Sequence, residues 1–459
     1  MSVTVMLNPD LVARYDRSGP RYTSYPPATV FHEGFDEASY RAAATRSNEQ
    51  QSPRPLSLYF HIPFCSTVCY YCACNKIVTK NRSRAEPYVA ALLQELTLQA
   101  ALFDGERTVE QLHWGGGTPT FLSTNQMRQL MQATRRHFRL RDDDGGEYSI
   151  EIDPRTVNQH DMAMLRELGF NRVSFGVQDF DEKVQKAVNR IQSQEQTLEL
   201  MAAARRQEFH SISIDLIYGL PFQSVGSFSQ TLDKVIAARP DRLAVFNYAH
   251  LPQRFKVQRQ IDENALPAPE EKLRILALTI QRLQEAGYVY IGMDHFALPE
   301  DKLSLALANG SLQRNFQGFS SHGQCELVAM GITAIGQVDD CYAQNLRDTG
   351  SYYERLKAGE LPVYRGLRLT PDDRLRRRVI ADLICHGYVD KAAVVDDFNA
   401  YFAPEVAQLA PMQADGLLRD DDNGIRVLAP GRLLIRNICM LFDGYLREES
   451  HPQRFSKAI

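Results

Sequence analysis

One pattern repeats six times between residues 56 and 286 and limits the possible folds more than any other feature of this sequence. A short run rich in β-branched and aromatic residues is followed by a loop and then by a segment of helical periodicity. The strand candidates are LSLYFHI (56–62), VEQLHWG (109–115), YSIEID (148–153), RVSFGVQ (172–178), SISIDLIYG (211–219) and RLAVFNYAH (242–250). The helix candidates lie near 84–103, 123–138, 158–168, 193–208, 224–238 and 270–286. This alternation predicts a parallel sheet covered on both faces, either an open doubly wound sheet or a barrel.

The polar residues of these strands favour the barrel. They occur near the C-terminal ends of successive strand candidates, at Glu151, Gln178, Asp215, Asn247 and His250. Barrel enzymes build their sites from such positions, whereas a single polar strand end can also simply reach water. The set as a whole predicts a site at this end of the barrel.

The chain is long enough for more than one unit. Residues 1–55 contain SGPRYTSYPP and predict an irregular but ordered arm, which we expect to lie over the active site. Residues 56–369 hold the strand–helix units and their extension. Residues 370–459 predict a small helical domain of winged-helix type, in which LLRDDDNGIRVLAPGRLLI (417–435) forms a β-hairpin between helices.

Composition argues against several classes of function. The net charge of -4 lacks the basic excess that nucleic-acid binding requires, and the basic stretch LRLTPDDRLRRRVI (367–380) is expected to be a solvated helix face. No signal peptide or membrane-spanning run is visible, so we expect a cytoplasmic protein without a membrane partner. In that reducing compartment, clustered cysteines indicate metal or redox chemistry more than disulfides.

Four of the eight cysteines lie in HIPFCSTVCYYCACNK (61–76). Cys65, Cys69 and Cys72 form C-x3-C-x2-C directly after the first strand candidate, and no second ligand pair follows at zinc-finger spacing. Three thiolates in one loop suit a cubane iron–sulfur cluster, and they leave one iron open. Cys74 is the alternative fourth ligand, but its C-x-C spacing is short, so we predict a neighbour that does not bind the cluster.

A glycine-rich segment, HWGGGTPT (113–120), follows the second strand candidate. Three successive glycines allow backbone amides to approach a bound polar group, and one or two of them could serve only a tight turn. The segment is neither G-x-G-x-x-G nor a P-loop, which argues against binding of nucleotide phosphates.

The cysteine loop and the glycine segment together resemble the radical S-adenosylmethionine (SAM) superfamily. In that superfamily the open iron binds the amino and carboxylate groups of SAM, and the glycine motif binds its methionine end. Reduction of SAM releases a 5'-deoxyadenosyl radical that abstracts hydrogen from the substrate. The resemblance implies an α/β fold: a partial β/α barrel of radical SAM type with an N-terminal arm and a small, mainly helical C-terminal domain.

Further segments are similar to the family of oxygen-independent coproporphyrinogen III oxidases (dehydrogenases) of haem biosynthesis. In order they are GPRYTSYP, YFHIPFC, CNKIVT, LHWGGGTPT, GFNRVSFGVQDF, VNR, DLIYGLP, FNYAHLP, GMDHFA, RNFQGF and GRLLIRNICM. The family's reaction converts two propionates of coproporphyrinogen III to vinyl groups and gives protoporphyrinogen IX. The implied cofactors are a [4Fe-4S] cluster held by Cys65, Cys69 and Cys72, and two molecules of SAM.

The resemblance also implies which residues bind the two SAM molecules. Those expected around the SAM on the open iron are Tyr59, Gly116, Glu151 and Ile335. Those expected around the second SAM are Tyr71, Gly117, Thr118, Gln178, Arg190, Asp215 and Ala249. Glu151 and Asp215 can accept hydrogen bonds, and Arg190 can pair with a carboxylate. The alternatives are a surface ion pair for Arg190 and ordinary core packing for Ile335 and Ala249.

Arg21, Tyr22 and Gln317 are the candidates for contact with the substrate, although Arg21 could instead only anchor the arm. A haem chaperone of the same superfamily is the alternative function, and the arm and Cys74 argue against it. A winged-helix DNA-binding protein is a third hypothesis. The expected partners are coproporphyrinogen III and an electron donor such as flavodoxin or ferredoxin, and we expect a monomer. The sequence identifies neither the terminal electron acceptor nor the order in which the propionates react.

Overall fold

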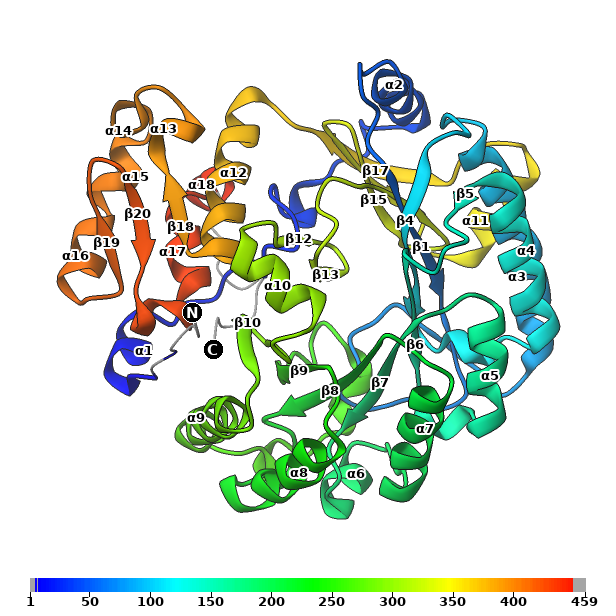
Figure 1. Cartoon of the computed structure of the whole chain (residues 1–459), viewed down its shortest axis with the longest axis horizontal. Coiled ribbons are helices and arrows are strands. Elements are labelled where there is room, and N and C mark those ends of the chain that lie inside the picture. The colour runs from blue at the N-terminus through cyan, green and yellow to red at the C-terminus, as the bar shows by residue number, and fades with distance from the viewer. Residues whose placement is uncertain (1–4, 6, 449–459) are drawn as a thin grey trace.

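The computed structural model describes residue 5 and residues 7–448. Its centre is a curved sheet whose six parallel strands follow the order of the chain, β1 to β9. These strands are β1 (Leu56–Ile62), β4 (Thr108–Gly116), β6 (Glu147–Ile152), β7 (Arg172–Gln178), β8 (Ser211–Tyr218) and β9 (Arg242–Asn247). The helices that connect them lie on the outer face of the curve (Figure 1): α3 (Ala85–Ala100), α4 (Thr124–His137), α5 (Gln159–Glu167), α7 (Gln194–Arg206), α8 (Val225–Ala238) and α9 (Pro269–Glu285). The predicted β/α barrel is confirmed.

The barrel is partial because antiparallel strands extend both edges of the parallel sheet instead of closing it. Beyond β1 come β14 (Glu326–Met330), which is parallel to β1, and then the antiparallel strands β15 (Ile335–Val338), β16 (Cys341–Asn345) and β17 (Val363–Arg368). Beyond β9 come β11 (His295–Ala297) and β10 (Val289–Gly292). The sequence analysis did not predict these antiparallel strands.

Burial explains why the parallel strands form. In β1 all residues except Tyr59 are buried, as expected of a strand covered on both faces. Trp114 on β4 packs edge-on against Phe60 and Phe170, with ring centroids 5.9 Å and 5.1 Å apart. The helices begin at polar caps, such as the Ser123–Gln126 capping box of α4. These features hold the C-terminal strand ends, and the loops after them, in fixed positions.

Short elements complete the barrel region. They are β2 (Phe64–Cys65), β3 (Ile77–Val78), β5 (Arg139–Leu140), α6 (Glu182–Ala187), α10 (Lys302–Asn309), β12 (Gln313–Asn315), β13 (Gly318–Ser320) and α11 (Thr349–Lys357). The hairpin β12–β13 carries Gln317 in its turn, and its last residue, Ser320, is bound to Gln111 near the start of β4.

The N-terminal segment is more regular than predicted. It contains α1 (Pro9–Tyr15) and α2 (Glu37–Asn48), so the prediction of an irregular segment is wrong for these residues. Asn8 and Asp36 cap the two helices through hydrogen bonds to backbone amides, which is the usual signal for a helix start. The stretch between them, which includes Arg21 and Tyr22, crosses to the C-terminal elements.

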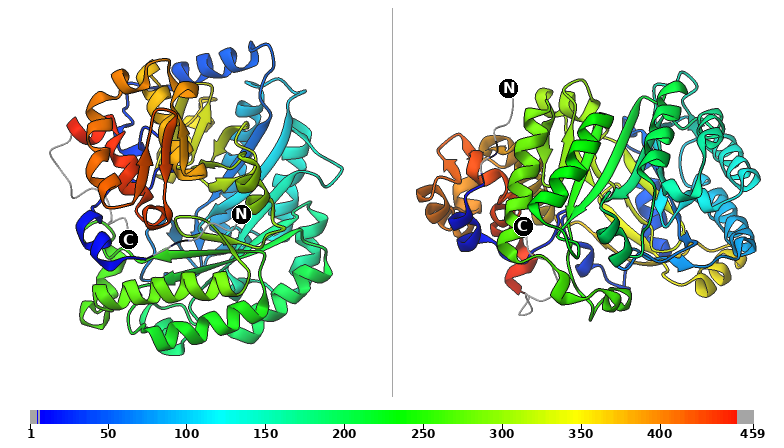
Figure 2. Two further views of the ribbon diagram at one scale, coloured as in Figure 1. Left: turned by 60° about the vertical axis from the view of Figure 1, so that its left-hand side comes forward. Right: turned by 90° about the horizontal axis from the view of Figure 1, so that it is seen from below.

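The C-terminal elements have their own hydrophobic cluster. They are α12 (Pro371–His386), β18 (Tyr388–Asp390), α13 (Lys391–Val394), α14 (Phe398–Tyr401), α15 (Ala403–Ala407), α16 (Leu409–Ala414), β19 (Leu418–Asp420), β20 (Gly424–Val427), α17 (Ile435–Leu441) and α18 (Gly444–Glu448). The expected hairpin is present as the antiparallel pair β19–β20. In both views of Figure 2 the helix α1 lies against these elements. Among the described residues, no helix has both the length and the apolarity needed to cross a bilayer.

Candidate functional site

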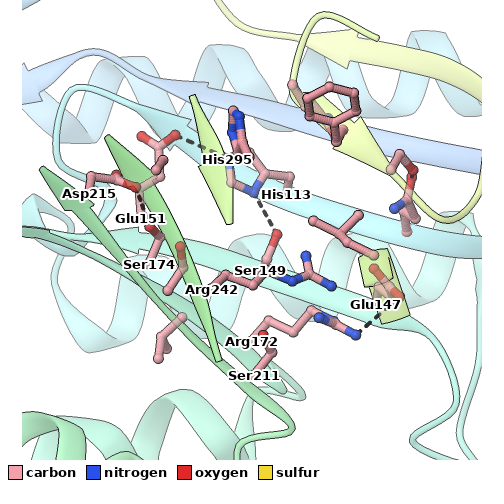
Figure 3. A pocket seen from close by; sticks show the side chains of 18 of the residues that line it. His113, Glu147, Ser149, Glu151, Arg172, Ser174, Ser211, Asp215, Arg242 and His295 are labelled. Atoms are coloured by element: carbon pink, nitrogen blue, oxygen red, sulfur yellow. Dashed lines mark hydrogen bonds and ion pairs between the residues drawn. The ribbon is translucent and has the colours of Figure 1, made fainter. Parts of the chain in front are cut away.

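A cavity of about 220 Å³ lies inside the curve of the sheet. Its wall contains Glu151 of β6 and Asp215 of β8, which are labelled in Figure 3, and Gln317 of the β12–β13 turn. Three predicted site residues from distant parts of the sequence therefore meet here. Register explains the first two: Glu151 pairs with Ser174 of β7, and Asp215 pairs with Gly176 two residues further along the same strand. Asn247 lines a smaller neighbouring cavity.

The cysteine loop begins at the end of β2. Cys72 donates its backbone N–H to the carbonyl of Cys69 (3.1 Å), which folds the loop into a tight turn. The sulfur of Cys65 accepts from the Thr118 hydroxyl at 3.6 Å, and the sulfur of Cys69 accepts from Arg190 Nη1 at 3.4 Å and Arg155 Nη2 at 3.7 Å. Donors and cations near sulfur favour the thiolate, but at Cys65 burial outweighs the bond from Thr118 and raises the pKa of the thiol to about 11.

This donor set fits an iron–sulfur cluster. Three thiols from one short loop with hydrogen bonds to sulfur are the kind of environment in which such clusters are held. Within residue 5 and residues 7–448, no group of three His, Cys, Asp or Glu side chains is arranged to bind a single metal ion. A cubane cluster does not need such a group, because each thiolate binds a different iron.

Cys74 is exposed beside Cys72. Its hydrogen bond to Cys72, with help from Lys76 and against the effect of burial, lowers the pKa of the Cys72 thiol to about 6. Lys76 Nζ donates to the carbonyl oxygens of Cys72 (3.1 Å) and Cys74 (3.5 Å) and so ties the end of the loop together. The role of Cys74 as a neighbour that does not bind the cluster stays a prediction.

The glycines of the HWGGGTPT segment are needed for close approach of the backbone. A Cβ at Gly116, where φ is 110°, would lie 2.4 Å from the His61 ring, and one at Gly117 would lie 2.6 Å from the backbone carbon of Pro63. The two amides already have partners, since Gly116 donates to Glu151 Oε2 (3.0 Å) and Gly117 to the carbonyl of Ile62 (2.8 Å). These glycines therefore shape the wall of the site rather than present free amides.

Glu151 is the centre of a polar cluster at the top of the cavity. Its carboxylate accepts from Gly116 and lies 3.2 Å from His113 Nε2, and the His113 ring stacks on Tyr59 with centroids 5.8 Å apart. Burial raises the pKa of Glu151, but the hydrogen bond from His113, its charge and the bond from Gly116 outweigh burial and lower it. Glu151 is therefore ionised at neutral pH. The Tyr59 hydroxyl is bound to His61 Nδ1 at 3.1 Å.

Asp215 differs from Glu151 although both carboxyl groups face the same cavity. Ser174 Oγ donates to Asp215 Oδ1 at 3.2 Å. Burial, and then the charge of Glu151, raise the pKa of Asp215 to about 7. Glu151 and Asp215 thus have pKa values shifted in opposite directions. Asp215 is the one whose charged form a hydrogen-bond donor or a cation would stabilise more.

Arg190 connects the cysteine loop to the barrel. Its guanidinium, in a residue only 6% exposed, donates to Cys69, to Asp153 at 3.2 Å and to the Gly176 carbonyl at 2.5 Å. The alternative of a surface ion pair is therefore wrong. Gln178, the last residue of β7, has a positive φ of 69°.

The remaining predicted SAM contacts are Tyr71 and Ala249, which lie in loops, and Ile335, which lies in β15. Gln258 Nε2 donates to the backbone oxygens of Tyr71 (3.1 Å) and Ala249 (3.2 Å), which brings these two residues together. Ile335 begins β15, where it pairs with Gln344. Its side chain packs against the small cluster around Phe31, as the alternative of ordinary packing expected.

The arm is fixed to both of its neighbours. Arg21 Nη1 lies 3.3 Å from Asp294 Oδ2 near the mouth of the barrel. The Tyr22 hydroxyl donates to Asp443 at 3.0 Å, and Tyr22 is only 4% exposed, so this ring anchors the arm to the C-terminal elements. Arg436 donates to the carbonyl oxygens of Gly19 and Pro20. Both interpretations of Arg21 remain open, because it lines the smaller cavity and also forms the ion pair.

The sequence analysis did not select four residues that the structure brings into the site: His61, His113, Asp153 and Asp294. His113 alternates with Gly115 on β4, so strand periodicity could have placed it on the inner face. His61, with Nε2 at 3.1 Å from the Asn75 carbonyl, had a similar signal on β1. For Asp153 and Asp294 the only signal in the sequence was a position near the end of a strand.

Comparison with known proteins agrees with this geometry. A family model described as the radical SAM superfamily matches residues 59–235, and one described as the HemN C-terminal domain matches residues 369–434. An oxygen-independent coproporphyrinogen III oxidase of Pseudomonas aeruginosa is 53% identical over 460 residues, which is 99% of each chain. The protein of the same name from Escherichia coli K12 is 49% identical over 453 residues, which is 98% of each chain.

A solved structure supports the same assignment. It is described as the coproporphyrinogen III oxidase (HemN) of Escherichia coli, a radical SAM enzyme. It matches with a TM-score of 0.91 at 47% identity and covers 96% of this chain and 100% of that chain. The superfamily implies a [4Fe-4S] cluster and SAM as cofactors, which fits the thiols and donors described above. The chain belongs to the family of oxygen-independent coproporphyrinogen III oxidases within the radical SAM superfamily.

Proposed function

We propose that this enzyme decarboxylates two propionates of coproporphyrinogen III to vinyl groups without oxygen and so forms protoporphyrinogen IX. One observation carries the proposal. Arg190 joins the Cys69 sulfur to the carbonyl of Gly176, whose neighbour across the sheet is the cavity residue Asp215. The cysteine loop therefore adjoins an enclosed polar cavity at the C-terminal strand ends, where barrel enzymes carry out their chemistry.

Each residue of the cysteine loop has a proposed task. Cys65, Cys69 and Cys72 would hold the cluster, with Thr118 and Arg190 donating to their sulfurs. When bound, the cluster and SAM supply a 5'-deoxyadenosyl radical that takes one hydrogen atom from the β-carbon of each reacting propionate. The propionate then loses carbon dioxide and one electron to become a vinyl group. The protein's work is positioning and exclusion of water more than acid–base catalysis.

Two SAM molecules form part of the proposal. The first would contact Tyr59, Gly116, Glu151 and Ile335, where the ionised Glu151 can accept from an amino group. The second would contact Tyr71, Gly117, Thr118, Gln178, Arg190, Asp215 and Ala249. The raised pKa of Asp215 supports a ligand there, because a donor brought near this carboxyl would lower the free energy of its charged form.

Arg21 and Gln317 would face the substrate, and Tyr22 would anchor the arm. Among the described residues, the Gln317 side-chain nitrogen is buried at the cavity without a hydrogen-bond partner, which supports a polar ligand near it. We further propose an electron donor such as flavodoxin or ferredoxin, an unidentified terminal acceptor, and a monomeric protein. The eight free cysteines support a reducing, cytoplasmic location.

The test is anaerobic reconstitution with iron and sulfide, followed by SAM, a reductant and coproporphyrinogen III. We expect 5'-deoxyadenosine together with mono- and divinyl products by chromatography. Deoxyadenosine without a vinyl product would refute the substrate assignment and leave the radical chemistry intact. Stable haem binding without turnover would favour the chaperone alternative, to which the relatives described above lend no support.

A further inference from the structure

The floor of the cavity contains two arginines that the proposed cofactor sites do not use. Arg172 begins β7 and Arg242 begins β9, so both lie at the N-terminal ends of strands whose C-terminal ends carry the proposed SAM contacts. Both line the same cavity as Glu151 and Asp215. In Figure 3 their side chains extend into the cavity on the side of Glu147. The cavity therefore extends from the proposed SAM contacts to a floor that holds two arginines and their carboxylate partners, Glu147 and Asp301.

The two guanidinium groups are only partly satisfied. Arg172 Nη2 lies 3.1 Å from Glu147 Oε1, and Arg242 Nε lies 2.9 Å from both oxygens of Asp301. Three further nitrogens are buried with no hydrogen-bond partner in the part of the chain that the structure describes: Nε and Nη1 of Arg172 and Nη2 of Arg242. Arg172 is only 6% exposed. Buried N–H groups of a guanidinium are rarely left unpaired. We therefore expect a bound group to accept hydrogen bonds from these nitrogens.

Electrostatics indicate that the acceptor is an anion. Burial, and then the charge of Arg242, lower the pKa of Arg172 to about 10, and the charges of Glu147, Asp301 and Asp241 offset this only in part. An added carboxylate would offset it further. Its two oxygens match the fork of an arginine, and the neighbouring Ser211 and Ser149 hydroxyl groups line the same wall.

We propose that the Arg172–Arg242 pair binds a propionate carboxylate of the substrate that is not reacting, and so sets which side of the macrocycle faces the cofactors. This inference rests on the proposed function. Glu147 and Glu151 are four residues apart on β6, so the floor lies about 13 Å along the strand from the proposed SAM contacts. A tetracarboxylate that reaches into this cavity needs partners for the charges that do not react.

The competing explanation is that the arginines only seal the bottom of the barrel in ion pairs with Glu147 and Asp301. The two explanations differ in their prediction for Glu147. Glu147 Oε1 also accepts from Ser321 Oγ at 2.9 Å and lies 3.5 Å from Lys302 Nζ and from His322 Nε2. If the pair is structural, Glu147→Gln therefore disturbs the site at least as much as Arg172→Gln does. If the pair binds a carboxylate, Glu147→Gln frees a further nitrogen of Arg172 and leaves substrate binding unchanged or tighter, whereas Arg172→Gln weakens it.

The experiment measures steady-state kinetics and equilibrium binding of coproporphyrinogen III under anaerobic conditions for the reconstituted wild type, R172Q, R172K and E147Q. We expect R172Q to raise KM and the dissociation constant about 10- to 100-fold, the range for loss of a charged hydrogen bond. R172K should recover part of this loss. Formation of 5'-deoxyadenosine without substrate should not change, since the pair lies away from the cysteine loop.

Equal effects of R172Q and E147Q on KM, or an unchanged KM in R172Q, would overturn the inference. If R172Q does not fold, Arg242→Lys replaces it: a lysine keeps a charge for Asp301 but removes the unpartnered nitrogen, and we expect KM to rise about 10-fold. A wild type without vinyl product would instead refute the proposed function. Turnover by the wild type with an unaltered KM in R172Q and R242K would refute only this inference.

Discussion

The buried carboxyl group of Asp215 should destabilise the protein as the pH rises. Its pKa is raised from 3.8 to about 7, so between these values the folded state keeps a proton that the unfolded chain has released. The contribution to stability is therefore fully present below about pH 4 and is lost as the pH rises through about 7. At ~1.36 kcal/mol per pKa unit, the loss between pH 5 and pH 8 is on the order of 2–3 kcal/mol.

Asp215→Asn removes this loss, because an amide oxygen can still accept from Ser174 and has no charge to bury. In thermal unfolding of the ligand-free protein, the difference in Tm between D215N and wild type should widen in favour of D215N from pH 5 to pH 8. Other titrating groups are common to both proteins and cancel in this difference. In the proposed function, the same substitution should weaken SAM binding.

A matched control is Asp348→Asn at the N-terminus of α11. Asp348 accepts from the Ser351 amide at 2.8 Å, and this bond lowers its pKa, so it is ionised in both states across the whole range. The Tm difference for D348N should therefore be constant from pH 5 to pH 8. A constant difference for D215N as well would refute the reasoning, because it would mean that the carboxyl group is not desolvated.

Three further predictions concern the site. Gly117→Ala should cost about 1–3 kcal/mol and reduce iron incorporation, because its Cβ would lie 2.6 Å from the backbone carbon of Pro63; iron and sulfide analysis after reconstitution checks this. Cys74→Ala should retain the cluster that Cys65→Ala loses, and equal loss of iron in the two variants would make Cys74 a ligand. Arg21→Ala should raise the substrate KM or abolish turnover while reductive cleavage of SAM continues; unaltered turnover would leave Arg21 as an anchor only.

The six strand–helix units could be predicted because their signals are local. Strand β1 is buried on both faces, β7 and β8 alternate buried with half-buried residues, and the helices repeat their apolar residues at helical spacing, as α4 does. The strands β15 and β16 gave no such signal, since IGQV and CYAQN are short and mix polar with apolar residues. They form a local hairpin, in which Val338 lies opposite Cys341, and this hairpin joins the sheet through β14, which pairs with the distant strand β1. The cap at Asp36 was a local signal for α2 that the sequence analysis overlooked.

In the candidate site, too, some residues could be predicted from local signals and others could not. Glu151 and Asp215 could be predicted from their strand-end positions, because the register of a parallel sheet brings such positions together. The partners of Arg190 could not, since they lie on the cysteine loop, on the loop after β6 and on β7. Arg172 and Arg242 could not be predicted as site residues either, because cations at strand starts normally reach solvent. Only the tertiary structure encloses these two side chains.

The hydrogen bonds from Arg436 to the carbonyl oxygens of Gly19 and Pro20 limit the order in which the chain can fold during synthesis. The contact joins residues more than 400 positions apart, and the bond from Tyr22 to Asp443 closes over a similar distance. Neither can form until almost the whole chain has left the ribosome. The strands β1 to β9 and the cysteine loop are complete long before that point. In a nascent chain the cysteine loop is therefore available before residues 19–22 can bind the C-terminal elements.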